Sequence, residues 1–297
     1  MKLPRKPWHG VMVATPLPFR ADLSIDLDAY AAHCAWLVGQ GCDGVVPNGS
    51  LGEYQVLTAD ERAQVVETAV AAVGGDRVMP GVSAYGSAEA RRWAEHARES
   101  GCASVMLLPP NAYRADERAV RAHFAEVAQE GLPVVAYNNP HDTKVDLTPE
   151  LIAALHADGH IQAVKEFSGD VRRAYSIAEL APGLDLLAGA DDVLLELAVA
   201  GAKGWVAGYP NALPAAGVEL YRAAVGGDLI RARQLYRELH PLLRWDSRPE
   251  FVQAIKLSMD LAGRHGGPCR PPRGPLLPEQ EATVRAATGK ALAEGLN

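Results

Sequence analysis

The chain has 297 residues, 48% of them hydrophobic and 22% charged, a composition typical of a globular protein with one large domain or two small ones. Its net charge of −7 argues against nucleic acid or an anionic membrane as a partner, because both require a basic surface. No apolar stretch approaches membrane-spanning length, and no apolar segment follows the basic residues near the N-terminus, so we expect a cytoplasmic protein that is neither exported nor anchored.

The four cysteines predict neither a disulfide framework nor a metal site. Cys34, Cys42, Cys102 and Cys269 include no CxxC pair, and no histidine lies near them at the spacing that zinc sites use. Free thiols fit the reducing environment of the cytoplasm.

Eight short apolar runs of the β type alternate along the chain with longer amphipathic stretches. They begin roughly 20 to 35 residues apart, which is the spacing that successive strand and helix units require. Because the runs are hydrophobic almost throughout, they predict parallel strands that are covered on both faces. The predicted strands are residues 10–15, 44–47, 78–82, 104–108, 133–137, 161–166, 184–188 and 204–207.

Helix start and stop signals lie between these runs. The start signals are Asp26 before residues 27–39, a capping box from Thr58 to Glu61, Ser87 before residues 90–99, and Thr148 followed by Pro149. Three glycines stand where helices should end, at Gly41, Gly101 and Gly131.

Eight parallel strands in about 210 residues favour a closed (β/α)₈ barrel of the α/β class over an open doubly wound sheet. The absence of a GxGxxG motif after the first predicted strand also argues against a dinucleotide-binding sheet. We expect residues 1–226 to form a catalytic barrel. Residues 227–297 are expected to be a C-terminal helical extension packed on it within a single domain, because they have too few apolar positions for a core of their own.

Polar residues follow several predicted strands at the ends where barrels of this kind carry their chemistry. They are Thr15, residues 48–53, Tyr137 with Asn138, Lys165 within its strand, and residues 189–192. Several separate segments therefore converge on one predicted pocket. The loop 48–53 has two glycines around a hydroxyl and would offer backbone N–H groups to a carboxylate, although such a string is also typical of a plain turn.

Lys165 is the candidate nucleophile of this pocket. A lysine in an apolar strand is costly to bury as a cation, so its amine is kept partly neutral, which is the state that attacks a ketone to form a Schiff base. The alternative is a lysine on the polar face of an edge strand, since lysines are seldom buried. Tyr137 would carry protons beside it, or would only fill the rim of the barrel.

Together, these motifs resemble the dihydrodipicolinate synthase and N-acetylneuraminate lyase superfamily of class I, Schiff-base-forming aldolases. Residues 48–53 are similar to the family's Gly-(Ser/Thr)-X-Gly-Glu loop, residues 137–140 to its Tyr-Asn-X-Pro motif, and residues 164–166 to the segment with its Schiff-base lysine. The resemblance covers nearly the whole chain, with the motifs in the family's order.

The resemblance implies the roles of three residues in the reaction. Lys165 would form an imine with pyruvate or a larger 2-oxo acid, Tyr137 would donate and accept protons, and Ser50 would relay them. No metal and no organic cofactor is expected, because the imine itself supplies the electron sink.

The resemblance also implies how the substrate is bound. The backbone around Ser50 would hold its carboxylate, and the backbone of Val206 would line the pyruvate pocket. The segment with Asp191 is similar to the place where sialic acid lyases bind a polyol tail, although a helix N-cap with an acidic first turn is an equally good interpretation. The substrate-binding candidates are Gly49, Ser50, Leu51, Asp142, Gly189, Asp191 and Val206, and Glu53 is expected to fix the loop.

Two positions depart from the synthase pattern. Asp142 stands where the synthases have an arginine that binds the second carboxylate of the condensing partner, and an acidic group would repel that carboxylate. Ala112, with Tyr113 next to it, stands where they have the tyrosine of a hydroxyl relay across a subunit contact. These departures favour another member of the superfamily over a true dihydrodipicolinate synthase.

We therefore expect a lyase that acts on a hydroxylated 2-oxo acid: cleavage or dehydration of a 2-oxo-3-deoxy sugar acid, cleavage of 4-hydroxy-2-oxoglutarate, or deamination of a hydroxy-pyrroline carboxylate. Asp142, Asp191 and Asp192 would accept hydrogen bonds from substrate hydroxyls. Two alternatives stay open, namely condensation of pyruvate with aspartate semialdehyde and a non-catalytic regulator that binds 2-oxo acids on the same barrel. The resemblance also implies a homo-oligomer, a tetramer or a dimer.

Overall fold

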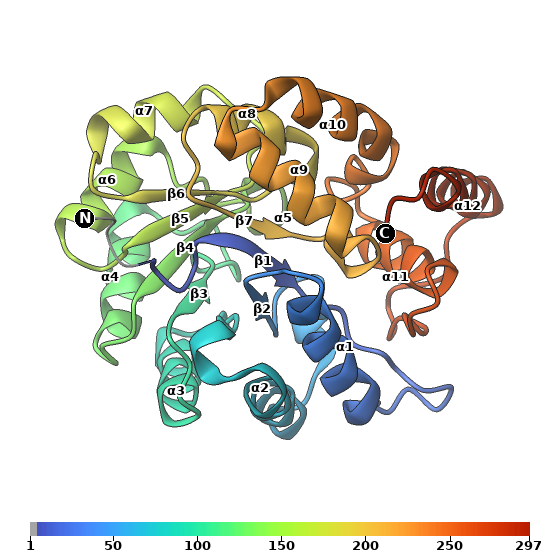
Figure 1. Cartoon of the computed structure of the whole chain (residues 1–297). Helices are drawn as coiled ribbons and strands as arrows, with labels where there is room; N and C mark the ends of the chain where they lie inside the picture. The colour runs from blue at the N-terminus through green and yellow to red at the C-terminus, as the bar shows by residue number, and fades with distance from the viewer. Residues whose placement is uncertain (1–4) are drawn as a thin grey trace.

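Parallel strands occupy the centre of the molecule and helices surround them (Figure 1). The computed structural model describes residues 5–297. Seven strands pair in the order β2-β1-β7-β6-β5-β4-β3, and all pairs are parallel. Their bounds are β1 Gly10–Ala14, β2 Gly44–Val46, β3 Val105–Leu107, β4 Val134–Asn138, β5 Ala163–Glu166, β6 Asp185–Ala188 and β7 Gly204–Ala207.

The segment 78–82 closes the ring between β2 and β3. It bridges β2 through Val78 and β3 through Gly81, both in parallel, and the N–H of Gly81 donates to the carbonyl of Pro47 at 2.8 Å. Pro80 has no N–H to donate, so the ladder is interrupted and the segment forms bridges but no regular strand. The eight predicted strands are thus seven strands and one bridging segment of a closed α/β barrel.

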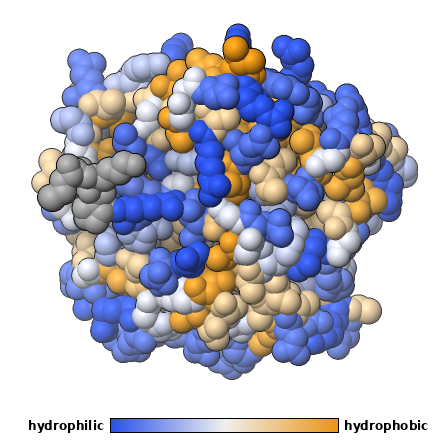
Figure 2. All heavy atoms as spheres, viewed as in Figure 1, coloured by the Kyte–Doolittle hydropathy of each residue, from blue (hydrophilic) through white to orange (hydrophobic). Residues whose placement is uncertain are grey.

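Helices cover the outside of the ring. Those that follow the strands are α1 Leu27–Gly39, α2 Ala59–Val73, α3 Ser87–Glu99, α4 Glu117–Ala128, α5 Pro140–Thr143, α6 Pro149–Ala157, α7 Arg173–Leu180, α8 Leu194–Val199 and α9 Pro214–Gly226. Short 3₁₀ turns lie between them at η1 Tyr54–Val56, η2 Gly75–Arg77, η3 Asp191–Val193 and η4 Tyr209–Asn211. Figure 2 shows hydrophilic side chains over most of one face, with apolar ones in small groups between them.

Most of the predicted start signals are confirmed. The side chain of Asp26 caps α1, Thr58 and Glu61 form the capping box of α2, and Thr148 caps α6. The prediction for α3 was wrong in detail, because the helix begins at Ser87 itself. The hydroxyl of Ser87 is hydrogen-bonded to a ring nitrogen of His123 and does not cap the helix.

The C-terminal extension, residues 227–297, contains α10 Leu229–Leu243, α11 Phe251–Leu261 and α12 Pro278–Ala293. Figure 1 shows these helices together at one side of the barrel, in orange to red, with α10 beside α9. Lys256 of α11 reaches the loop after β2, where its amine lies 2.7 Å from a carboxylate oxygen of Glu53. Among the helices of residues 5–297, none is long and apolar enough to cross a membrane.

Candidate active site

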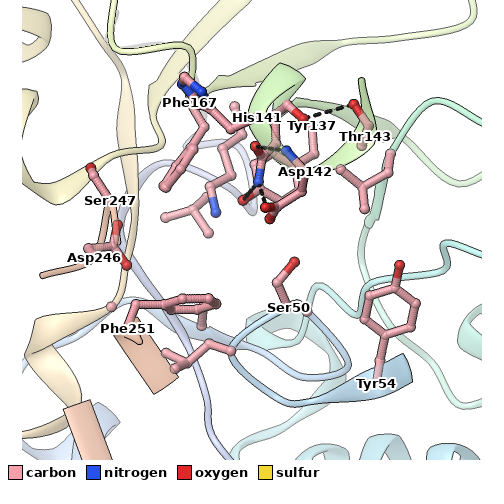
Figure 3. A pocket seen from close by; sticks show the side chains of 18 of the residues that line it. Ser50, Tyr54, Tyr137, His141, Asp142, Thr143, Phe167, Asp246, Ser247 and Phe251 are labelled. Carbon is pink, nitrogen blue, oxygen red and sulfur yellow. Dashed lines mark hydrogen bonds between the residues drawn. The ribbon is translucent and has the colours of Figure 1, made fainter. Parts of the chain in front are cut away.

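A cavity of about 630 Å³ lies at the carboxyl ends of the strands (Figure 3). This is the end at which barrel enzymes place their chemistry. Its walls include seven of the residues that the sequence singled out: Gly49, Ser50, Leu51, Tyr137, Asp142, Lys165 and Val206. The predicted convergence of separate segments therefore occurs in part, with residues from the loop after β2, from β4, α5, β5 and β7, whereas Thr15, Asn138 and residues 189–192 are not on the cavity wall.

Lys165 and Tyr137 lie side by side because their strands pair in register. Tyr137 of β4 is opposite Lys165 of β5, and the Lys165 amine is 4.0 Å from the centre of the tyrosine ring. The lysine is 6% exposed, and none of the ion pairs of residues 5–297 involves it. Burial lowers the pKa of the amine from 10.5 to about 8, although the nearby carboxylates, led by Asp246, favour the cation.

Tyr137 is a buried phenol with one hydrogen-bond partner among the described residues. The side-chain amide of Asn139 donates to its hydroxyl at 3.2 Å and also donates to a carboxylate oxygen of Asp142 at 2.9 Å. Burial raises the pKa of Tyr137, so the phenol keeps its proton at neutral pH. Within residues 5–297 no hydrogen bond joins Tyr137 to Ser50, but Figure 3 shows both side chains at the same cavity.

The loop after β2 offers three unused backbone donors to the cavity. Within the described chain, the N–H groups of Gly49, Ser50 and Leu51 donate to no protein acceptor, whereas that of Glu53 donates to the carbonyl of Ser50. Three consecutive free N–H groups on a cavity wall are a candidate anion site.

Glu53 holds this loop in place, as expected from the sequence. Its carboxylate is 1% exposed and accepts from Lys256 at 2.7 Å and from the N–H of Arg270 at 3.0 Å. Both partners belong to the C-terminal extension, so the extension fixes the geometry of the anion site.

Comparisons with known proteins show the family and the fold of the chain. The model of the Dihydrodipicolinate synthetase family matches residues 7–291. The chain belongs to this family. A 4-hydroxy-tetrahydrodipicolinate synthase of Methanothrix thermoacetophila is 34% identical over 281 residues, which are 94% of this chain and 95% of the relative.

Two solved structures show the same fold. The crystal structure of a putative dihydrodipicolinate synthetase from Pseudomonas aeruginosa has a TM-score of 0.90 and 32% identity, with coverage of 95% of this chain and 99% of that one. A prophage protein of the dihydrodipicolinic acid synthase family from E. coli K12, solved in complex with pyruvate, has a TM-score of 0.88 and 27% identity, with coverage of 97% and 99%. This member of the dihydrodipicolinate synthetase family is thus an α/β barrel with a C-terminal helical extension.

Asp191 does not line the cavity of this family member, contrary to the expectation that it binds substrate. It is fully buried, and its carboxylate accepts from the indole N–H of Trp205 at 2.9 Å and from the backbone N–H groups of Gly208 and Tyr209. Burial raises the pKa of Asp191 to about 6, and these donors oppose the rise. The carboxylate holds the turn after β7. Asp191 and Asp192 do form an acidic first turn of η3, as the alternative interpretation expected, but the N-cap of η3 is Ala190.

Gly189 also lies outside the cavity wall. A Cβ at this position would lie 2.4 Å from the carbonyl oxygen of Glu166, so a glycine is required for packing between β5 and β6. Asp192, the other acidic residue of this segment, accepts from the hydroxyl of Ser247 at 2.7 Å. Asp191 and Gly189 are therefore not on the cavity wall, and Asp192 lies one hydrogen bond behind Ser247, which is.

The cavity contains residues that sequence reasoning missed, and several come from the C-terminal extension. Asp246 is 8% exposed, Arg248 lies over the ring of Trp245 at 4.5 Å, and Arg273 lies over the ring of Phe251 at 5.2 Å. No strand end marks these positions. The one signal in the sequence is a run of polar residues, 246–248, between two amphipathic helices.

Proposed function

We propose that the protein is a Schiff-base-forming lyase that acts on pyruvate-type 2-oxo acids. The observation that carries the proposal is the buried amine of Lys165, without an ion pair among the described residues and 4.0 Å from the ring of Tyr137. The neutral amine attacks the keto carbon, the carbonyl oxygen leaves as water, and the resulting protonated imine draws electrons from the adjacent bond as that bond breaks.

Tyr137 is the proton donor and acceptor in this proposal, with Ser50 as a relay. A phenol that keeps its proton can give it to the oxygen that leaves as water and can take one back from the departing group. Asn139 supports this role, since its amide orients the hydroxyl of Tyr137 by a hydrogen bond of 3.2 Å.

The free N–H groups of Gly49, Ser50 and Leu51 support binding of the 2-oxo acid carboxylate at the loop after β2. The backbone of Val206 in β7, the second strand from β2 in the ring, would line the pocket for the pyruvyl part. The relative solved with pyruvate supports a substrate of this class.

We favour a hydroxylated 2-oxo acid as the substrate. Asp142 supports this choice, because its carboxylate lines the cavity where it can accept from a hydroxyl and where it would repel a second carboxylate. The step would be cleavage or dehydration of a 2-oxo-3-deoxy sugar acid, cleavage of 4-hydroxy-2-oxoglutarate, or deamination of a hydroxy-pyrroline carboxylate.

The second candidate is the synthase reaction, condensation of pyruvate with aspartate semialdehyde. Two observations favour it. The similar protein of Methanothrix thermoacetophila has that name, and Arg248 and Arg273 on the cavity wall could bind a second carboxylate in place of an arginine at position 142.

A substrate panel separates these candidates. The purified protein is incubated with each hydroxylated acid, and separately with pyruvate plus aspartate semialdehyde, and products are followed by proton NMR with Lys165→Ala as the control. We expect consumption of a hydroxylated acid by the wild type only. Consumption of aspartate semialdehyde alone would assign the synthase reaction, and pyruvate binding without turnover of any substrate would assign a non-catalytic regulator.

We also propose a homo-oligomer, a tetramer or a dimer, in the cytoplasm. Tyr85 and Tyr113 support self-association, because these large aromatic side chains are 76% and 59% exposed near the starts of α3 and α4. Sedimentation velocity of the wild type and of Tyr113→Ser tests this proposal, and a wild-type monomer at micromolar concentration would contradict it.

A further inference from the structure

Asp246 is an acidic residue of the cavity that comes from outside the barrel. It lies in the loop between α10 and α11 and is 8% exposed. Figure 3 shows it beside Ser247 and near Phe251, on the cavity wall. The site on the barrel therefore contains a carboxylate that the C-terminal extension supplies.

Hydrogen bonds hold this carboxylate by one oxygen and leave the other free. Oδ2 accepts from the backbone N–H of Asp191 at 3.2 Å, and the adjacent hydroxyl of Ser247 donates to Asp192 at 2.7 Å. Oδ1 has no donor among the described residues, and it lies close to the backbone of Gly208, where an added Cβ would be 2.6 Å from it. Asp246 is 8% exposed, so its charge is only partly hydrated, and such a charge is costly unless a positive charge lies nearby.

The acidic groups around Lys165 differ in the number of hydrogen bonds that their carboxylates already accept. Asp191 accepts from three N–H groups, and Asp142 accepts from the amide of Asn139. Asp246 retains a free oxygen, and its charge acts on Lys165 more strongly than that of the other two acids. Tyr137, whose ring lies against the amine, keeps its proton, and the other titratable side chains of the cavity wall are Tyr54, His141, Lys144, Arg248 and Arg273.

We propose that Asp246 is the charge partner of Lys165 and stabilises the cation that forms on its nitrogen during the reaction. This inference rests on the imine chemistry proposed above. After the amine has attacked the keto carbon and water has left, the imine nitrogen keeps one proton and carries a positive charge. A carboxylate in the same buried cavity lowers the energy of that cation far more than it would in water.

The charge partner also explains why burial does not abolish the basicity of Lys165. Burial alone lowers the pKa of Lys165 and raises that of Asp246, and the attraction between the two groups opposes both shifts. Removal of the negative charge should therefore lower the pKa of the lysine further. The amine would then be neutral at lower pH, while the imine cation would lose its stabilisation.

The test is the pH dependence of pyruvate imine formation, measured by borohydride trapping and intact mass, together with turnover of the substrate that the panel identifies. In Asp246→Asn, a carbonyl oxygen remains for the N–H of Asp191, and only the charge is lost. We expect the midpoint of the trapping profile to fall by about one pH unit and turnover to fall by about 10- to 100-fold.

Two further variants test whether the effect depends on the negative charge at position 246. Asp246→Glu retains the charge and should keep the wild-type midpoint, and Glu250→Gln removes a carboxylate from the same loop but outside the cavity wall. Should Asp246→Asn fail to fold by circular dichroism, Asp246→Ser replaces it, since a hydroxyl can also accept from Asp191.

An unchanged midpoint and unchanged turnover in the uncharged variant would overturn the role of Asp246 and leave the imine chemistry intact. The same change in Glu250→Gln as in Asp246→Asn would also overturn it, because the effect would then be one of net charge. Absence of any adduct in the wild type would instead refute the imine chemistry on which the inference rests.

Discussion

Lys165 has a depressed pKa because it is buried and has no ion-pair partner among the described residues. Its neighbours are the rings of Tyr137 and Phe167, at 4.0 and 5.6 Å from the amine. Aromatic faces attract a cation only modestly, so they do not replace its hydration. The structure thus supports a lysine that is neutral in about half of the molecules near pH 8.

The first prediction concerns pH. Only the neutral amine attacks a ketone, so the rate of adduct formation with pyruvate should rise with pH and reach half of its plateau near pH 8. The measurement is the initial rate of borohydride-trapped adduct from pH 6 to 10. A midpoint near the ordinary lysine pKa of 10.5 would show that the amine is solvated in solution.

The second prediction concerns Tyr137. Its replacement by phenylalanine retains the ring that contacts Lys165 and removes only the hydroxyl to which Asn139 donates. Turnover should fall by about 10²- to 10³-fold, as is typical for loss of a general acid and base. Steady-state kinetics measure the effect. A change of less than about threefold would assign the tyrosine to the rim of the barrel.

At the scale of elements, α11 and the loop after β2 depend on each other through a buried ion pair. Glu53 and Lys256 are 1% and 2% exposed, and the carboxylate of Glu53 also accepts from the backbone of Arg270. The pair is 203 residues apart in sequence and joins the anion site to the extension. Removal of one partner would leave the other charge buried without compensation.

The third prediction follows from this pair. Lys256→Met should lower the free energy of unfolding by about 3 to 5 kcal/mol, because the buried carboxylate of Glu53 loses its ion-pair partner. Urea denaturation measures the change. The double variant Glu53→Gln with Lys256→Met should recover part of the loss, and a single variant within about 1 kcal/mol of the wild type would contradict a buried pair.

The sequence predicted the elements wherever local patterns decide them. The caps at Asp26, Thr58 and Thr148 act over three residues, and the strand ends with Tyr137 and Lys165 follow from apolar runs. The third predicted strand contains Pro80, which has no N–H, and the structure shows only isolated bridges there. The pattern of apolar residues alone predicted a full strand.

Residues whose role depends on distant partners could not be predicted. Asp191 carries the same sequence signal as a substrate-binding or capping acid, but its donors lie 14 to 18 residues further along, at the end of β7. Asp246 has no signal of its own, because its place in the cavity depends on how α10 and α11 pack on the barrel. Sequence patterns that span a few residues predict neither the donors of Asp191 nor the place of Asp246 in the cavity.

At the scale of the whole molecule, we expect the barrel and the extension, residues 1–226 and 227–297, to unfold as one unit. Glu53 with Lys256, and Asp246 with the N–H of Asp191, join the two parts by buried contacts. Calorimetry should show one unfolding transition, and a chain truncated after Gly226 should not fold. Two separate transitions, or a folded truncated barrel, would contradict a single domain.

The proposed function depends on one covalent bond, between the amine of Lys165 and the keto carbon of a 2-oxo acid. The most direct test is reduction with borohydride in the presence of pyruvate, followed by peptide mapping with mass spectrometry. We predict one adduct per chain, on the peptide that contains Lys165, and none in Lys165→Ala. No adduct on the wild type, or an equal adduct on the variant, would contradict the account.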